Sequence, residues 1–337
     1  MSNPVLVNTW RGDVVENRHR GTVVVCDPRG RVVFSHGDVD ELVYPRSSIK
    51  SLQAIPLVES GAADHYGLRD IEIALACSSH NAEPEHTRTV NAWLEQIGLD
   101  ENDLECGAHE PLNQASAKRL IEDAITPTRV HNNCSGKHAG MLTCARFHGQ
   151  ATQGYIERDH PSQQAWFDVL DALADIESRN LPWNYDGCGI PVVAMPLRAV
   201  ATAFARFAAP DDLSAARADA SARIADAVAA QPFMVAGNGR LCTELMKITG
   251  RRVAVKTGAQ GVFTASIPDM SLGVALKIDD GSTVASEVAL IATLQHVNAL
   301  SADETEELRN HAQPAIHNTR DVLTGHSAPS NVWDLHA

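Results

Sequence analysis

The stretch Arg46-Ser47-Ser48-Ile49-Lys50 places a serine and a lysine three residues apart. If a helix begins here, Ser47 and Lys50 lie on the same face, one turn apart. A serine hydroxyl is a poor nucleophile until a base takes its proton, and a neutral lysine amine one turn away can be that base. The alternative is an N-cap serine followed by an ordinary solvated lysine. Taken alone the pair favours this alternative, because Ser-x-x-Lys is common by chance.

Two later stretches change this balance. Ser79-His80-Asn81 supplies a Ser-x-Asn, and Lys256-Thr257-Gly258 supplies a Lys-Thr-Gly within a β-rich segment. Ser-x-x-Lys, Ser-x-Asn and Lys-Thr-Gly, in this order, form the signature of serine β-lactamases and penicillin-binding proteins. Only six of the 28 basic residues are lysines, and a lysine, unlike an arginine, can lose its proton and act as a base. The ordered set predicts that Ser47 and Lys50, together with Ser79 and Lys256, carry catalysis. Alternatives remain for the second pair: Ser79 as an ordinary loop serine, and Lys256 as a strand-edge charge or a point charge that holds a substrate carboxylate.

Composition sets limits on the class of protein. The chain has 337 residues and a net charge of −14, which argues against a protein that binds nucleic acid or an anionic membrane surface by charge. No apolar run approaches the ~18 residues that span a bilayer, and no secretory signal is visible at the start. Seven scattered cysteines without a Cys-x-x-Cys predict reduced thiols and a cytoplasmic location.

Strands are predicted near both ends of the chain. The Val-rich runs Thr22–Cys26 and Arg31–Ser35 flank the turn sequence Asp-Pro-Arg-Gly and predict a hairpin. Three further apolar or alternating runs predict strands: Val253–Thr257, Gly261–Ile267 and Leu272–Ile278. Between these regions, helical spacing predicts helices over His86–Ile97, Gln114–Ala124, Gly136–Phe147, Ser162–Ile176 and Asp212–Ala229, and another follows over Val284–Leu300.

This order of elements predicts an α+β fold. We expect one antiparallel sheet built from both termini, covered by helices in an αβα sandwich of the β-lactamase and penicillin-binding-protein type, with an inserted helical lobe. Residues 1–75 and 250–337 would form the sheet lobe, and residues 76–249 the helical lobe. The catalytic residues would lie between the two lobes, where ligand sites commonly form.

Two cysteines stand in polar turns. Cys134 lies in Asn-Asn-Cys-Ser-Gly-Lys-His directly before an apolar helix, and Cys188 lies in Asp-Gly-Cys-Gly. The stretch around Cys134 has three explanations. It is a simple helix cap, or Cys134 is a thiolate whose pKa is lowered at the helix N-terminus, or Cys134 is a metal ligand. Spacing alone favours the cap, because structural zinc usually takes four Cys or His ligands. The stretch Gly237–Arg240 reads as a turn rather than as an anion-binding nest.

Together, five stretches resemble the asparaginase II family, the rhizobial-type L-asparaginases, and the resemblance spans nearly the whole chain. They are Arg-Ser-Ser-Ile-Lys, Cys-Ser-Ser-His-Asn, Asn-Asn-Cys-Ser-Gly-Lys-His, Asp-Gly-Cys-Gly and Lys-Thr-Gly-Ala. The resemblance implies a fold related to serine β-lactamases and glutaminases, and a homodimer. It implies two catalytic Ser–Lys pairs, Ser47 with Lys50 and Ser79 with Lys256.

The resemblance also implies a zinc site formed by Cys134, Lys137 and Cys188, in which a lysine amine and water complete the metal shell. Four neighbours of the catalytic and metal residues are implied as substrate-binding groups: Arg46, His80, Asn81 and Asp186. The implied reaction is hydrolysis of L-asparagine to L-aspartate and ammonia through an acyl-enzyme. Alternatives are a glutaminase, another serine hydrolase of the β-lactamase type, and a zinc-dependent amino-acid sensor without catalysis.

Overall fold

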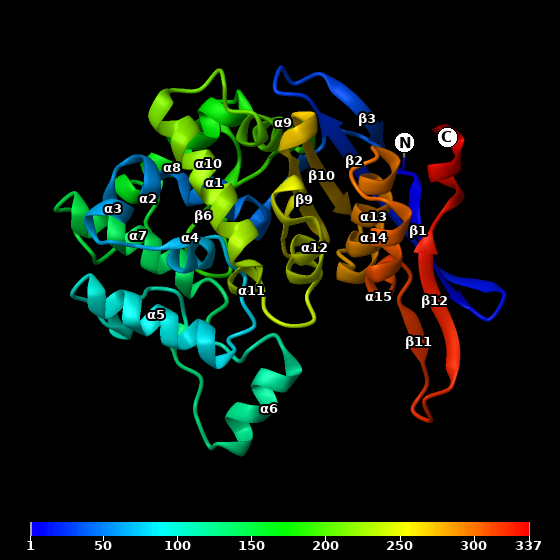
Figure 1. Ribbon diagram of the computed structural model, residues 1–337, viewed down its shortest axis with the longest axis horizontal. Coiled ribbons are helices and arrows are strands. Elements are labelled where there is room, and N and C mark those ends of the chain that lie inside the picture. Colours follow the sequence, from blue (N-terminus) through cyan, green and yellow to red (C-terminus); the bar gives the residue numbers. More distant parts are fainter. Residues whose placement is uncertain (1, 337) are drawn as a thin grey trace. The chain divides into compact units, whose positions relative to one another are not determined.

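The structure is a computed structural model that describes residues 2–336. The chain divides into two compact units, which we describe separately (Figure 1). Unit 1 contains Met1–Ser48, Ala194–Ala209 and Glu244–Ala337, and unit 2 contains Ile49–Val193 and Pro210–Thr243. No helix within the described residues is long and apolar enough to cross a membrane.

A curled antiparallel sheet forms unit 1. Its strand order is β11-β12-β1-β2-β10-β9-β8, with β3 paired to β2. The strands are β1 (Val5–Arg11), β2 (Val14–Cys26), β3 (Val32–His36), β8 (Ala254–Thr257), β9 (Val262–Ile267), β10 (Leu272–Ile278), β11 (Ala315–His317) and β12 (Leu323–Pro329). The two short strands β4 (Leu42–Val43) and β7 (Met195–Pro196) pair separately. The expectation of an antiparallel sheet built from both ends of the chain is therefore confirmed.

Helices pack against the centre of this sheet. α9 (Leu197–Ala208) contacts β2, β9 and β10, while α13 (Thr283–His296) contacts β1, β9, β10 and β12. Every residue of β9 is buried, as expected for a strand covered on both faces. Gly273 lets α9 come close, because a Cβ at this position would lie 2.1 Å from the Ala201 carbonyl oxygen. Two short helices, α14 (Ala302–Glu307) and α15 (Arg309–Ala312), also belong to this unit.

Unit 2 is mainly helical. Its helices are α1 (Lys50–Gln53), α2 (Ile55–Glu59), α3 (Ala62–His65), α4 (Asp70–Ala76), α5 (Pro84–Gln96), α6 (Gln114–Glu122), α7 (Ser135–Phe147), α8 (Pro161–Ala174), α10 (Ala215–Ala230) and α11 (Pro232–Val235). α12 (Leu241–Thr249) has residues in both units. α7 is buried from Ser135 through Ala145 and contacts α2, α3, α4, α5 and α8. A helix buried on all sides carries its polar side chains into the interior, where each needs a partner.

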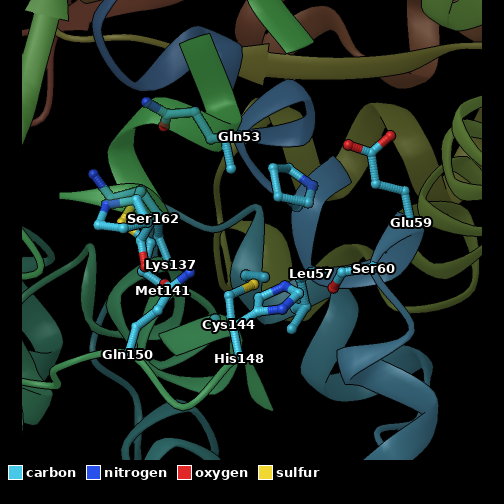
Figure 2. A pocket seen from close by; sticks show the side chains of 16 residues that line it. Gln53, Leu57, Glu59, Ser60, Lys137, Met141, Cys144, His148, Gln150 and Ser162 are labelled. Carbon is cyan, nitrogen blue, oxygen red and sulfur yellow. The ribbon is translucent and has the colours of Figure 1, made fainter. Parts of the chain in front are cut away.

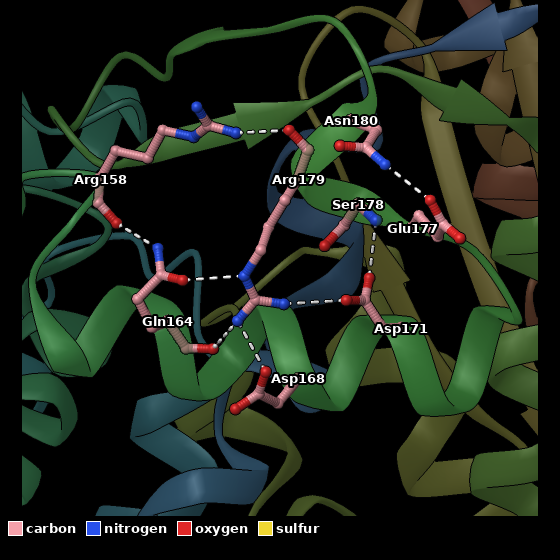
Figure 3. A network of polar contacts seen from close by, with 8 residues as sticks. All are labelled: Arg158, Gln164, Asp168, Asp171, Glu177, Ser178, Arg179 and Asn180. Atoms are coloured by element: carbon pink, nitrogen blue, oxygen red, sulfur yellow. Dashed lines mark hydrogen bonds and ion pairs between the residues drawn. The ribbon is translucent and has the colours of Figure 1, made fainter.

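An ion-pair network fixes the chain after α8. Arg179, in the 3₁₀ turn Ser178–Asn180, donates to Asp171 Oδ2 at 2.9 Å and to Asp168 Oδ1 at 2.6 Å (Figure 3). The backbone N–H of Ser178 donates to the other oxygen of Asp171 at 2.7 Å. These bonds anchor the turn that leads into the hairpin of β5 (Trp183–Tyr185) and β6 (Pro191–Val193).

The α+β fold class is confirmed, whereas the boundaries of the units differ from the predicted lobes. Residues 49–75 form α1 to α4 and belong to unit 2, because their apolar faces pack on α7, α8 and α10. Ala194–Ala209 belongs to unit 1 because α9 packs on the sheet.

Candidate functional site

Lys50 lies at the centre of a buried polar cluster in unit 2. It is the first residue of α1 and only 1% exposed. Its amine donates to the Ser78 carbonyl oxygen, to Ser79 Oγ at 3.1 Å and to Cys134 Sγ at 3.1 Å. Lys50 therefore connects a serine hydroxyl to a thiol, and each lies far from it in the sequence.

Ser79 follows α4, in a loop that neighbouring backbone holds in place. Its N–H donates to the Val235 carbonyl oxygen at 2.9 Å, and the next N–H, of His80, donates to the Asn133 carbonyl oxygen at 3.2 Å. The guanidinium of Arg240 reaches the Ser79 carbonyl oxygen at 3.5 Å. Ser79 itself is 5% exposed. Its hydroxyl is therefore held against the Lys50 amine.

Asn81 holds this loop to the turn at Gly237–Arg240. Its side-chain N–H groups donate to Glu83 Oε1 and to the Asn238 carbonyl oxygen, both at 3.1 Å, and its Oδ1 accepts from Arg240 at 3.0 Å. Gly237 is required here, because a Cβ would lie 2.5 Å from Glu83 Oε1 and φ is +112°. The predicted turn is observed, but Arg240, expected to be exposed, is half-buried and hydrogen-bonded to the loop of Ser79. No local sequence signal links Arg240 to residue 81.

His80 is neutral. Burial lowers its pKa well below the ordinary value, and the nearby His86 and Lys50 charges act in the same direction. Its Nδ1 accepts from the Ala82 N–H at 3.1 Å, so the proton is assigned to Nε2, which lies 2.8 Å from Ser135 Oγ. A neutral imidazole with both nitrogens engaged supports the loop and the start of α7.

Cys134, Lys137 and Cys188 meet at the N-terminus of α7. Cys134 is the N-cap residue of the helix, Lys137 lies one turn further on, and Cys188 lies in the β5–β6 hairpin. The Lys137 amine donates to Cys188 Sγ at 3.0 Å. All three side chains are at most 5% exposed. The residues that the resemblance assigns to one metal site are therefore brought together in space.

The two sulfur atoms have opposite pKa shifts. Sharing a hydrogen bond with Cys188, together with burial, raises the pKa of the Cys134 thiol to about 12. The same hydrogen bond lowers the pKa of Cys188 well below its usual range, against burial and with help from Lys137. Burial lowers the pKa of Lys137, but the two sulfurs outweigh this effect and raise it overall. The Lys137 amine next to Cys188 therefore favours the thiolate form of that sulfur.

The donor set fits a thiophilic metal ion with three protein ligands. Among the described residues, no group of three His, Cys, Asp or Glu side chains is arranged to hold a metal. The cluster supplies two buried thiols instead, and the third donor is the Lys137 amine, which would bind a metal only after losing its proton. Asp186, in the same hairpin, contributes a negative charge toward Lys137.

The remaining predicted residues lie in unit 1. Arg46 and Ser47 are half-buried in the 3₁₀ turn Arg46–Ile49, and Arg46 has a φ of 53°, in the left-handed region that side chains seldom adopt. Gly258 packs under this turn, because a Cβ there would lie 2.8 Å from the Pro45 carbonyl oxygen. Strain beside a candidate nucleophile is typical of functional sites.

The strand that carries Lys256 packs on the same turn. Thr264 Oγ1 donates to the Ser48 carbonyl oxygen at 2.9 Å and to the Lys256 carbonyl oxygen at 3.3 Å. Lys256 is 2% exposed, and its amine donates to the Thr257 carbonyl oxygen at 2.8 Å. Ser47 and the Lys-Thr-Gly strand therefore belong to one region of unit 1, while Lys50 and Ser79 are paired within unit 2.

Comparison with known proteins identifies the family. The chain is a hydrolase whose sequence matches one family model over residues 7–329. That model describes L-asparaginase II, and because it covers nearly the whole chain, the protein belongs to the L-asparaginase II family. The resemblance found in the sequence motifs is confirmed. No curated protein matches the chain significantly.

Solved structures with distant similarity include two hydrolases. A β-lactamase from Mycobacterium bovis shares 14% identity, with 83% of this chain and 95% of that chain covered and a TM-score of 0.42. A D-alanine carboxypeptidase from Burkholderia cenocepacia shares 12% identity, with 81% and 93% covered and a TM-score of 0.38. The family assignment depends on the sequence match.

Proposed function

We propose that the protein hydrolyses L-asparagine to L-aspartate and ammonia by Ser–Lys catalysis. The observation that carries the proposal is the Lys50 amine, 3.1 Å from Ser79 Oγ, in a member of the L-asparaginase II family. A lysine amine this close to a serine hydroxyl can accept its proton. The helical spacing in the sequence favours Ser47 as the partner of Lys50, whereas this distance favours Ser79.

The reaction proceeds through an acyl-enzyme. Ser79 Oγ attacks the carbon of the side-chain amide as the Lys50 amine takes the hydroxyl proton. The C–N bond then breaks, and the leaving nitrogen takes a proton from Lys50 and departs as ammonia. Water next attacks the ester carbon, gives a proton back through Lys50 to Ser79, and releases aspartate. Ser47 and Lys256 are the proposed second pair, which orients the amide or relays protons.

Cys134, Lys137 and Cys188 are the proposed zinc ligands. When bound, zinc would supply a positive centre that polarises or holds an oxygen or nitrogen atom. Two thiolate ligands offset most of its charge, so we assign it a holding role rather than the generation of hydroxide. Four residues are proposed to shape the substrate site: Arg46, His80, Asn81 and Asp186. His80 is hydrogen-bonded to Ser135, and Asn81 to Arg240, which supports a positioning role for these two.

Ammonia release from L-asparagine by the purified chain tests the proposal, with L-glutamine assayed in parallel and bound zinc quantified on the same sample. Release from asparagine with a clear preference over glutamine is expected. A folded, zinc-loaded sample that binds asparagine without releasing ammonia would instead support a sensor. Faster turnover of glutamine would make the protein a glutaminase.

A further inference from the structure

A cavity lies in unit 2, beside α7. It has a volume of about 280 Å³ and is lined by residues of α1, α2, α7 and α8 (Figure 2). Most of its wall is apolar, and Pro56, Leu57, Gly140 and Met141 form part of it. Neither Lys50 nor Ser79 lines it. Its size is that of a small organic molecule rather than of a few waters.

A buried hydroxyl in this wall has no partner. Ser162 stands in the first turn of α8 and is 7% exposed. Its N–H donates to His160 Nδ1 at 3.1 Å, but its Oγ has no hydrogen bond within the described residues. Buried hydroxyls are nearly always hydrogen-bonded, because losing water without a replacement partner is unfavourable. An unpaired hydroxyl that lines a cavity therefore points to a ligand that bonds to it.

The wall of the cavity also carries an unpaired acceptor. Gln150 Oε1 lines the same cavity and is also buried without a partner in the described part of the chain. Figure 2 shows Gln150 and Ser162 on one side of the cavity, next to Met141 and Lys137, with Glu59 on the opposite side. A hydroxyl that can donate and an amide oxygen that accepts together match a primary carboxamide, which has one C=O and one NH₂.

The charged groups on the wall are already compensated. Both oxygens of Glu59 accept from the Arg217 guanidinium, at 2.9 and 3.0 Å. The Lys137 amine donates to Cys188 Sγ at 3.0 Å. Burial raises the pKa of the Cys144 thiol to about 12, so this wall residue stays neutral. The cavity therefore favours an uncharged ligand over an anion or a cation.

We propose that this cavity is a binding site for a small uncharged molecule with an apolar ring or chain and a primary carboxamide. The carboxamide oxygen accepts from Ser162 Oγ, and its NH₂ donates to Gln150 Oε1. The apolar part packs against Leu57 and Met141. Lys137 belongs to the wall of this cavity and also contacts Cys188, so the cavity and the proposed metal cluster share this residue.

Calorimetric titration of the full chain with benzamide tests this site. Benzamide should bind, while benzoate, which is an anion, and toluene, which lacks the amide, should bind at least about tenfold more weakly. Ser162→Ala should weaken benzamide binding by about five- to tenfold, the loss expected for one hydrogen bond. Ala165→Leu should abolish it, because the added side chain enters the cavity from α8.

Ser178→Ala is the matched control. Ser178 is also fully buried with an unpartnered hydroxyl, but it does not line the cavity, so benzamide binding should not change. Ser79→Ala should also leave binding unchanged, which separates this site from the proposed catalytic serine whether or not asparagine is hydrolysed. The proposal is overturned if benzamide does not bind, if binding survives Ala165→Leu, or if Ser162→Ala leaves the affinity unchanged.

Discussion

Replacing Lys50 by methionine removes the amine that donates to Ser78, Ser79 and Cys134 and keeps a side chain of similar length. If this amine takes the serine proton, turnover should fall by about 10²- to 10⁴-fold, the usual contribution of a general base. That loss corresponds to about 2.7–5.4 kcal/mol in the activation barrier. Lys50→Arg should lose turnover similarly, because arginine keeps the charge but does not give up its proton.

The assay is steady-state ammonia release from L-asparagine, with thermal unfolding measured on each variant to confirm that it is folded. Lys247→Met is the matched control, since Lys247 is exposed on α12 and should be dispensable. Ser48→Ala is a second control, because the Ser48 hydroxyl donates to the Pro45 carbonyl oxygen at 2.7 Å. Near-normal turnover in Lys50→Arg would refute the assignment of this lysine as the base.

Three further predictions concern stability and metal binding. Gly258→Ala should lower the free energy of unfolding by about 1–3 kcal/mol, because its Cβ would lie 2.8 Å from the Pro45 carbonyl oxygen. Chemical denaturation measures this loss. Gly107→Ala is the control, because a Cβ at Gly107 would meet no atom within 4 Å. Cys134→Ser should lose bound zinc by elemental analysis, whereas Cys144→Ser should keep it. Burial lowers the pKa of His311, but two glutamates outweigh this effect and raise it overall. Its contribution to stability should therefore be full below about pH 6.5 and should be lost as pH rises through the folded-state pKa.

Each of these three predictions has an outcome that contradicts it. Equal unfolding midpoints and slopes for Gly258→Ala and Gly107→Ala would mean that the turn near Ser47 relaxes freely. Full zinc occupancy in Cys134→Ser would remove Cys134 from the ligand set. A His311→Gln variant whose stability depends on pH in the same way as the parent chain would show that the ion pairs of this residue are not the cause.

Local patterns predicted most of the elements. The hairpin at Asp27–Arg31 follows from its turn residues, and the helix predicted over Gly136–Phe147 is observed as Ser135–Phe147. The sequence did not reveal that the short buried run Ile71–Cys77 forms the helix α4 (Asp70–Ala76), with Cys77 as its C-cap. It also gave no prediction for α9, which lies against the sheet. The buried run of α4 is too short for helical periodicity to distinguish it from a strand. α9 does carry a helical pattern, with Arg198, Thr202 and Arg206 spaced four residues apart, so this pattern could have been found in the sequence.

The sequence by itself determined the family and the chemical groups available: two serines, three lysines and two cysteines in recognisable motifs. Only the tertiary structure decided which of these groups meet. Lys50 is hydrogen-bonded to residues 29 and 84 positions away. The hydrogen bond between Cys134 and Cys188 shifts the pKa values of these two thiols in opposite directions. Spacing within one helix reports contacts over three or four residues. Contacts between segments, and the unpaired hydroxyl of Ser162, depend on how the helices pack.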